Sequence, residues 1–148
     1  EGMLVPVTIR LETKTQAGIR VLPVDVARQI TLMLERVVSE GTATRAVVPH
    51  YRVAGKTGTV HKIKPGGGYE KDRYQSLIAG FAPVSDPRFV LVVMIDDPKG
   101  GKHFGGEVAA PAFGNIMADA LRLHRVAPDA PESTLEIAAR RGGLATDA

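Results

Sequence analysis

The chain has 148 residues, the usual size of one domain, and its 44% hydrophobic and 24% charged residues argue against a coiled coil, a collagen-like chain or a disordered protein. The scattered charge of +3 is too weak to indicate nucleic-acid binding, and the longest apolar run, residues 89–95, is far below the roughly 18 residues of a membrane-spanning helix. With no cysteine, the chain has no disulfide, zinc–thiolate site or thiol nucleophile.

The N-terminal part contains one strong helical pattern. Residues 3–11 are rich in β-branched residues but contain Pro6, which predicts an extended segment or edge strand, and residues 14–18 predict a polar turn. Residues 23–40 predict an amphipathic helix, which Gly41 ends. We expect its apolar stripe to pack against a sheet; the stripe consists of Val26, Ile30, Met33, Leu34, Val37 and Val38.

The middle of the chain predicts three strands. After a connection over residues 42–51, residues 52–60 form the first strand. Residues 76–82 and 89–95 predict an antiparallel hairpin, because the turn-rich residues 83–88 join them. The second strand of this hairpin has seven apolar residues in a row, which predicts burial on both faces.

Glycine-rich and charged segments separate these elements. Residues 61–75 include Pro65-Gly66-Gly67-Gly68 and the charged residues 70–73, which predicts a long flexible connection. A second glycine-rich stretch, residues 100–106, leads into a helix over residues 108–123 with a buried stripe of Phe113, Ile116, Met117, Ala120 and Leu121. Residues 126–148 predict a mobile tail. The order of elements predicts the α+β class, an antiparallel sheet covered by helices.

Chemistry concentrates in Gly55-Lys56-Thr57-Gly58-Thr59. A phosphate-binding loop ending in Gly-Lys-Thr needs a glycine where this chain has His50, so its spacing is wrong. The triplet on its own is compatible with a strand that merely contains these residues. It also matches the Lys-Thr-Gly strand of penicillin-binding proteins and serine β-lactamases, and its place before a hairpin and a C-terminal helix favours this interpretation.

Several spaced blocks carry a wider resemblance. They are Arg52 to Thr59, Tyr74 to Pro83, Val93 to Pro98 and Phe104-Gly105-Gly106 before a helix. Together they resemble the class B penicillin-binding proteins, and among these the division-specific peptidoglycan transpeptidases of Gram-negative bacteria. The resemblance covers roughly residues 1–129. It implies a penicillin-binding-protein and serine-β-lactamase-like fold, of which residues 1–125 would be the C-terminal segment.

The residue types of the strand suit recognition of a carboxylate. Thr57 and Thr59 are two apart on a strand and therefore offer hydroxyl donors on one face, and Lys56 adds positive charge. Gly55 and Gly58 leave the strand bare, so that a substrate backbone can approach. The resemblance further implies that Lys56 holds or relays the proton of the site serine and that the Thr59 N–H belongs to the oxyanion hole.

The nucleophile of such a site is not in this chain. The residues three positions after its serines are Thr42, Ala79, Arg88 and Glu136, so no Ser-x-x-Lys exists. Ser-x-Asn is absent as well. Since the family places both elements before Lys-Thr-Gly, we expect the nucleophile on a segment N-terminal to Glu1. The isolated chain is then expected to be inactive.

Aromatic and charged residues complete the candidate site. The resemblance places Tyr74 and Phe104 in an aromatic wall beside the substrate, with Gly105 next to it, whereas His103 departs from the tyrosine usual before Phe-Gly-Gly. Tyr74 is also compatible with a plain aromatic at a strand end. The four histidines have no metal-binding spacing, and we expect no metal or cofactor. Asp96 and Asp97 are expected as turn residues rather than a catalytic pair.

The resemblance implies a serine-type peptidoglycan D,D-transpeptidase of the periplasmic face of the inner membrane. Its partners would be the rest of the same protein, peptidoglycan stem peptides, β-lactams and cell-division proteins. Two alternatives stay open: a module that binds peptide carboxylates without chemistry, and a related D,D-carboxypeptidase or β-lactamase. An upstream Ser-x-x-Lys distinguishes the enzyme from the binding module.

Overall fold

The computed structural model describes residues 2–9 and 17–130, which fall into two compact units, residues 1–33 and residues 34–148. In the first unit, strand β1 (Met3–Leu4) pairs antiparallel with strand β2 (Ile19–Arg20). The expected extended segment is therefore present as a two-residue strand. Most of the expected polar turn lies outside the described residues.

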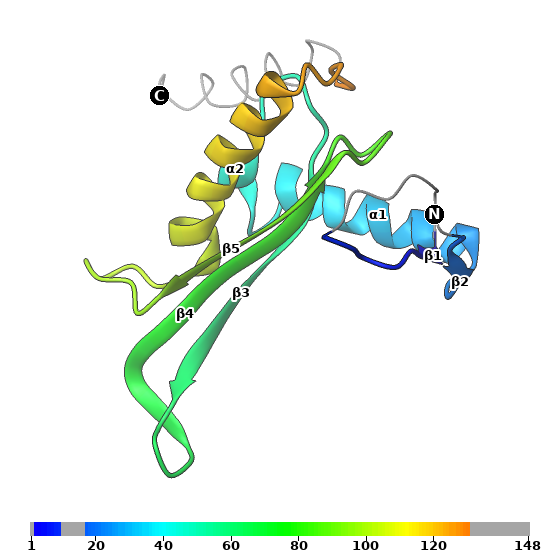
Figure 1. The fold of residues 1–148 in the computed structure, drawn as a ribbon. Coiled ribbons are helices and arrows are strands. Elements are labelled where there is room, and N and C mark those ends of the chain that lie inside the picture. The colour runs from blue at the N-terminus through cyan, green and yellow to red at the C-terminus, as the bar shows by residue number, and fades with distance from the viewer. Residues whose placement is uncertain (1, 10–16, 131–148) are drawn as a thin grey trace, which may run out of the picture. The chain divides into compact units, whose positions relative to one another are not determined.

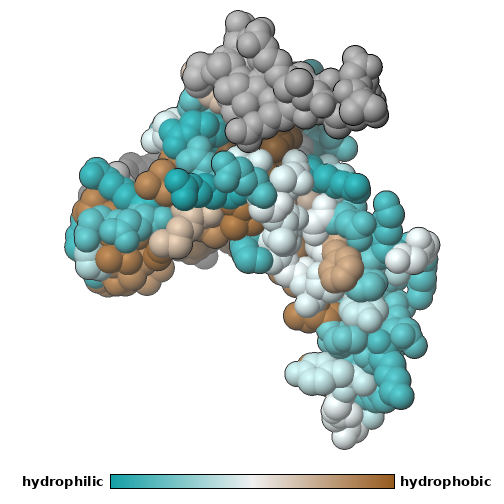
Figure 2. Space-filling model, turned by 180° about the vertical axis from the view of Figure 1, so that it is seen from behind, coloured by the Kyte–Doolittle hydropathy of each residue, from teal (hydrophilic) through white to brown (hydrophobic). Residues whose placement is uncertain are grey.

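Helix α1 (Val24–Ser39) follows Pro23 and ends two residues before Gly41, which confirms the helical prediction. Asp25 in its first turn complements the positive end of the helix dipole. Its apolar stripe is not packed as expected, because Val38 is its single buried residue in the described structure. Met33 is 60% exposed, and apolar side chains gather on the surface of the first unit in Figure 2.

The second unit is built on a three-stranded antiparallel sheet, with strands β3 (Ala54–Ile63), β4 (Tyr69–Ala82) and β5 (Phe89–Asp96) in that order (Figure 1). The register pairs Thr59 with Ser76 and Ser76 with Ile95. The predicted hairpin is thus confirmed, and β3 is an edge strand of the described sheet. With helices and an antiparallel sheet, the class is α+β, as predicted.

The prediction of a long flexible connection between the first two strands is wrong. Residues 70–73 belong to β4, and pairing continues as far as Ile63 opposite Tyr69. The turn closes through the Lys64 amide, which donates to the Gly68 carbonyl at 2.9 Å. Gly66, Gly67 and Gly68 all have positive φ, between 78° and 102°, which only glycine adopts easily. The glycines therefore make a tight turn, and Figure 1 shows the resulting ribbon extending from the sheet.

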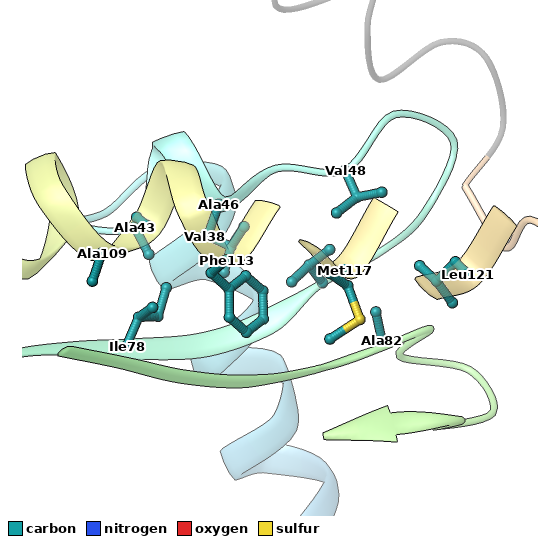
Figure 3. Packing of buried hydrophobic residues seen from close by; sticks show 12 residues of the cluster. Val38, Ala43, Ala46, Val48, Ile78, Ala82, Ala109, Phe113, Met117 and Leu121 are labelled. Atoms are coloured by element: carbon teal, nitrogen blue, oxygen red, sulfur yellow. The ribbon is translucent and has the colours of Figure 1, made fainter. Parts of the chain in front are cut away.

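Helix α2 (Gly105–Leu123) covers one face of the sheet, and the core lies between them (Figure 3). Phe113, Met117 and Leu121 are buried, as expected, whereas Ile116 is 50% exposed. The core is completed by side chains from the end of α1, from the 3₁₀ helix η1 (Thr44–Ala46) and the residues that flank it, and from β4. These side chains are Val38, Ala43, Ala46, Val48, Ile78 and Ala82.

The opposite face of β5 is open in the described chain. Burial alternates along the strand, and Val90, Val92 and Met94 are 79%, 64% and 58% exposed. The prediction of a strand buried on both faces is therefore wrong for these residues. A row of three large apolar side chains on one strand face is an apolar surface that further polypeptide can cover.

A two-point ion pair ties the start of β3 to the end of α1. Arg52 Nε lies 2.5 Å from Glu35 Oε1, and Arg52 Nη2 lies 2.7 Å from Glu35 Oε2. The hydrogen bonds that Arg52 donates to the Glu35 carboxylate raise the pKa of Arg52, against the opposing effect of burial. Such a planar pairing fixes direction as well as distance, so it sets where β3 begins.

Residues 126–130, which were assigned to the mobile tail, are held against the second unit. The Tyr51 hydroxyl donates to the Val126 carbonyl at 2.6 Å. The Asp129 carboxylate accepts hydrogen bonds from the Arg52 amide at 2.7 Å and the Ser85 amide at 3.0 Å. The tail beyond Ala130 lies outside the described residues. In the part of the chain that is described, no helix is long and apolar enough to cross a membrane.

Candidate active site

A pocket of about 460 Å³ lies where three segments of the second unit meet. The turn after α1, the first half of β3 and the N-terminal turn of α2 each contribute residues to it. The lining comprises Thr42, Thr44, Arg45, Lys56, Thr57, Gly58, Thr59, Phe104, Gly105, Gly106 and Glu107. Six of the eight predicted site residues are thus brought together; Gly55 and Tyr74 are not among those that line this pocket.

The two threonines of β3 both present hydroxyls to this pocket, and each is held by one neighbour. Thr57 Oγ1 lies 2.8 Å from Thr42 Oγ1, and Thr59 Oγ1 accepts a hydrogen bond from the Gly105 amide at 3.0 Å. A hydroxyl has one proton to donate. Since Thr59 accepts from Gly105, its own proton is available for a ligand in the pocket.

Positive charge dominates the pocket. Lys56 and Arg45 both line it, against the single carboxylate of Glu107. Lys56 Nζ donates to the Thr57 carbonyl at 2.8 Å, which places the ammonium beside the strand. The N-terminal residues of the 19-residue helix α2 also line the pocket, and the dipole of a helix favours an anion at that end.

The glycines of β3 pack closely against β4. A Cβ at Gly55 would lie 3.0 Å from the Ala79 carbonyl oxygen, and one at Gly58 would lie 2.9 Å from Leu77 Cδ1. These contacts are within the chain itself. Backbone packing therefore accounts for Gly55, whereas the end of the flexible Leu77 side chain can move aside and does not by itself require glycine at position 58.

The glycines at the start of α2 permit an even closer approach. A Cβ at Gly105 would lie 2.5 Å from the carbonyl oxygens of Gly58 and Leu77, and one at Gly106 would lie 2.1 Å from the Thr42 carbonyl oxygen. Contacts this short cannot be relieved by a side-chain rotation, because the atoms are backbone. The Gly-Gly pair is what lets the helix N-terminus reach the strand and form one side of the pocket.

Four rings form a continuous row beside the pocket. His61 lies 4.4 Å from Tyr74, Tyr74 stacks on His103 at 4.1 Å with an interplanar angle of 13°, and His103 lies 4.4 Å from Phe104, all between ring centroids. Phe104 lines the main pocket, while Tyr74 and His103 line a neighbouring one of about 340 Å³. Tyr74 therefore lies outside the main pocket, and the rings of His103 and Phe104 connect it to that pocket.

The acidic pair at the end of β5 is structural. Asp96 accepts hydrogen bonds from Lys62 and Gln75, and Asp97, with φ 52°, is bonded by Arg73 and Lys99 at 2.9 Å each. The hydrogen bond from Lys62 lowers the pKa of Asp96, and that from Lys99 lowers the pKa of Asp97. Among the described residues, no group of three or more His, Asp or Glu side chains is arranged to hold a metal ion.

Residues from the turn after α1 were missed by the sequence reasoning. Thr42, Thr44 and Arg45 lie 11 or more residues before Lys56 and were treated as part of a connection. A signal was present in the run of small residues after Gly41, since small residues permit close packing of a turn against a strand. Ser76, which is buried beside Thr59, was considered solely as a nucleophile.

Most of the chain is similar in sequence to known penicillin-binding protein transpeptidases. Residues 1–118 match the family model of the penicillin binding protein transpeptidase domain. The chain is 42% identical over 130 residues to the peptidoglycan D,D-transpeptidase FtsI of Escherichia coli (strain K12), covering 87% of this chain and 22% of that relative. It is 50% identical over 102 residues to stage V sporulation protein D of Bacillus subtilis (strain 168), covering 69% of this chain and 16% of that relative.

Solved structures give the same result. The apo transpeptidase domain of Burkholderia pseudomallei penicillin-binding protein 3 is similar with a TM-score of 0.77 and 44% identity, covering 88% of this chain and 40% of that one. The chain spans about a fifth of the length of these curated relatives. The resemblance to class B enzymes close to FtsI and penicillin-binding protein 3 is confirmed, and the chain belongs to the penicillin-binding protein transpeptidase domain family.

Proposed function

We propose that this chain supplies the Lys-Thr-Gly wall of a serine-type peptidoglycan D,D-transpeptidase. The observation that carries the proposal is the convergence of Lys56, the hydroxyls of Thr57 and Thr59 and the N-terminus of α2 on one pocket. Hydroxyl donors, an ammonium and a helix N-terminus together suit a carboxylate. A terminal D-alanyl carboxylate and the carboxylate of a β-lactam are the ligands of that chemistry in the family.

The proposed reaction needs a nucleophile from another segment, because no Ser-x-x-Lys exists in this chain. The serine oxygen attacks the carbonyl carbon of the penultimate D-alanine, the peptide bond breaks, and D-alanine leaves with the proton. The amino group of a second stem peptide then attacks the acyl-enzyme ester and releases the serine. A β-lactam is attacked in the same way, but its amide nitrogen stays attached and the ester persists.

The residues of this chain hold the substrate for that attack. Thr57 and Thr59 bind the carboxylate, and the Thr59 N–H contributes to the oxyanion hole, where one donor is typically worth about 10²–10³ in rate. Lys56 balances the carboxylate charge and helps to hold or relay the serine proton. Phe104 and Gly105 form the opposite side of the pocket. The free edge of β3 can pair with a peptide added as a further strand.

We further propose that residues 1–125 are the C-terminal segment of the transpeptidase domain. The exposed row of Val90, Val92 and Met94 supports this, since an apolar strand face of this kind suits coverage by more of the same domain. The proposed location is the periplasmic face of the inner membrane, and the proposed partners are stem peptides and cell-division proteins. The FtsI relatives support both proposals.

The test is acylation of the complete polypeptide that carries this segment. After exposure to a penicillin, mass spectrometry should show a mass increase of one covalently bound penicillin per protein. Thr57→Val and Thr59→Val should each slow acylation, because each raises its activation free energy by roughly 1–3 kcal/mol. The same measurement on this chain alone should show no adduct. Parent-like acylation by both threonine variants would contradict the assignment of the carboxylate pocket.

A second candidate is a module that binds peptide carboxylates without chemistry, and absence of Ser-x-x-Lys from the complete polypeptide would favour it. Such a module binds a D-alanyl-D-alanine peptide reversibly and gains no mass from penicillin. A carboxypeptidase or β-lactamase is separated from a transpeptidase by its products. Released D-alanine with no cross-linked dimer, or a hydrolysed β-lactam released at turnover rates, identifies those enzymes.

A further inference from the structure

We propose that Ser76 is a positioning residue for the carboxylate pocket. It holds the wall segment, which we define as residues 103–105, in the place from which Phe104 and Thr59 meet a ligand. This inference rests on the function proposed above, and it assigns a role to a residue that lies within the Tyr74 to Pro83 block but has no role among the predicted site residues.

Ser76 is the one buried polar side chain in the described part of the chain, at 0% exposure. It lies on the central strand β4, between Thr59 on β3 and Ile95 on β5. Its hydroxyl donates to the carbonyl of His103. A hydroxyl buried without a partner is destabilising, so a serine in the middle of a sheet needs such an acceptor. The wall segment provides it.

Ser76 and Thr59 hold the two ends of the wall segment. They are direct register partners on β4 and β3, so their side chains lie on the same face of the sheet. Ser76 binds the carbonyl of His103, and Thr59 accepts from the amide of Gly105 at 3.0 Å. The one residue between these bonds is Phe104, whose backbone is extended at φ −75° and ψ 136°. Two hydroxyls therefore fix the backbone that carries the Phe104 ring.

These two hydrogen bonds also determine whether the hydroxyl proton of Thr59 is available to a ligand. As long as the Gly105 amide donates to Thr59, the hydroxyl proton of Thr59 has to point elsewhere and stays available for a carboxylate. Loss of the Ser76 hydroxyl leaves the His103 carbonyl without its donor, so the segment shifts toward another partner. Gly105 then leaves Thr59, and both the donor and the aromatic wall lose their position.

The ring stack does not replace this hydrogen bond. Tyr74 packs on the His103 side chain at 4.1 Å, but it leaves the backbone carbonyl free to move. Ser76→Ala is therefore expected to leave the stack in place while it releases the backbone. This separates the proposed role of Ser76 from that of Tyr74.

The test uses the complete polypeptide with Ser76→Ala, a stability control and a surface control. Ile78→Val removes one methylene from the core two residues further along β4, and Ser85→Ala changes an exposed loop serine. Hydrogen–deuterium exchange measures the Gly105 amide, and stopped-flow kinetics with a penicillin separates noncovalent binding from acylation. For Ser76→Ala we expect about tenfold faster exchange at Gly105 and about fivefold weaker noncovalent binding.

The controls make the result specific. Ile78→Val should lower the melting temperature but leave the exchange rate at Gly105 and the noncovalent binding of penicillin unchanged. Ser85→Ala should match the parent in all three measurements. Unchanged exchange at Gly105 in Ser76→Ala overturns the proposal, and so does an equal change in Ile78→Val. A parent protein that forms no penicillin adduct refutes the proposed function instead, and in that case the Gly105 exchange rate alone decides the role of Ser76.

Discussion

The hydroxyls of Thr42 and Thr57 lie 2.8 Å apart and join the turn after α1 to the Lys-Thr-Gly strand. Either oxygen can be the donor in the free protein. When Thr57 donates its single proton to a ligand carboxylate, Thr42 has to be the donor of the pair. Thr42 therefore supports the state of Thr57 that binds an anion.

Thr42→Val is expected to weaken β-lactam recognition, because it removes this donor while keeping the shape of the side chain. One hydrogen bond contributes about 0.5–1.5 kcal/mol, so its loss should lower the second-order rate constant of acylation about two- to tenfold. Thr42→Ser keeps the hydroxyl and should restore most of the rate. Stopped-flow acylation of the complete polypeptide measures both variants, and a parent-like Thr42→Val would exclude this role.

Gly106→Ala tests the close contact between α2 and the turn after α1. Intrinsic helix propensity alone favours alanine by about 1 kcal/mol. We expect the opposite sign, because the new Cβ would lie 2.1 Å from the Thr42 carbonyl oxygen and push the turn away from the helix. Chemical denaturation should show lower stability, and acylation should slow as the pocket opens.

Gly114→Ala is the matched control for this change. It lies on the same helix, and its Cβ would approach the Arg45 carbonyl oxygen to 3.3 Å, a distance that a small shift can relieve. Gly114→Ala should therefore affect stability much less than Gly106→Ala and leave the acylation rate unchanged. Equal effects of the two variants would show that the close contact with the Thr42 carbonyl oxygen is not the cause of the destabilisation by Gly106→Ala.

Acid should weaken the loop after β5. The hydrogen bonds from Lys99 and Arg73 lower the pKa of Asp97 below its unfolded value of about 3.9. A carboxylate with a lowered pKa in the folded state contributes stability above its unfolded pKa and loses it as the pH falls through the folded value. Melting curves from pH 7 to pH 3 should show Asp97→Asn less stable than the parent near neutrality, with the difference narrowing as the pH falls below about 3.9.

Asparagine is a suitable replacement at this position, since asparagine and aspartate are both enriched among residues with a positive φ, here 52°. Asp119→Asn is the control, because its ion pair with Arg122 on α2 is exposed on both sides. It should shift the melting temperature little at any pH. A difference between Asp97→Asn and the parent that does not depend on pH would contradict the electrostatic explanation.

The sequence predicted those parts of the fold that depend on local pattern. Both long helices and the three strands follow from periodicity and turn residues, whereas the pocket-lining residues Lys56, Thr57 and Thr59 were identified through the Lys-Thr-Gly motif and the family resemblance. The β3–β4 ribbon was missed because charged residues 70–73 have no strand pattern of their own. They join β4 because a glycine turn brings them opposite β3, and pairing across that turn is a contact that local propensity does not contain.

The hydrogen bonds that organise the site could not be predicted from the sequence, because they join residues that are far apart along the chain. Ser76 and His103 are 27 residues apart, and Thr59 and Gly105 are 46 apart. Their contacts depend on the register of β3 with β4 and on the closeness that Gly105 allows. Burial of β5 on one face alone likewise depends on which elements cover the sheet, and seven apolar residues in a row do not specify that.

Lys56→Arg separates charge from proton transfer in the proposed site. Arginine keeps the positive charge but replaces a compact ammonium with a planar fork that does not give up a proton. Lys56 lies on β3 between Gly55 and Thr57, and its Nζ is bound 2.8 Å from the Thr57 carbonyl, a place that suits a small donor. Carboxylate binding should survive in part, whereas proton relay to or from the serine should not.

We therefore expect Lys56→Arg to lower the acylation rate constant more than it weakens noncovalent binding. Rapid-mixing kinetics over a range of penicillin concentrations resolves the two steps in the complete polypeptide. Lys62→Arg is a control on the same strand, since Lys62 pairs with Asp96 and is not among the residues that line the pocket. It should match the parent in both steps. An unchanged acylation rate constant in Lys56→Arg would show that Lys56 has a structural or electrostatic role and takes no part in proton relay, because arginine keeps the charge but does not give up a proton.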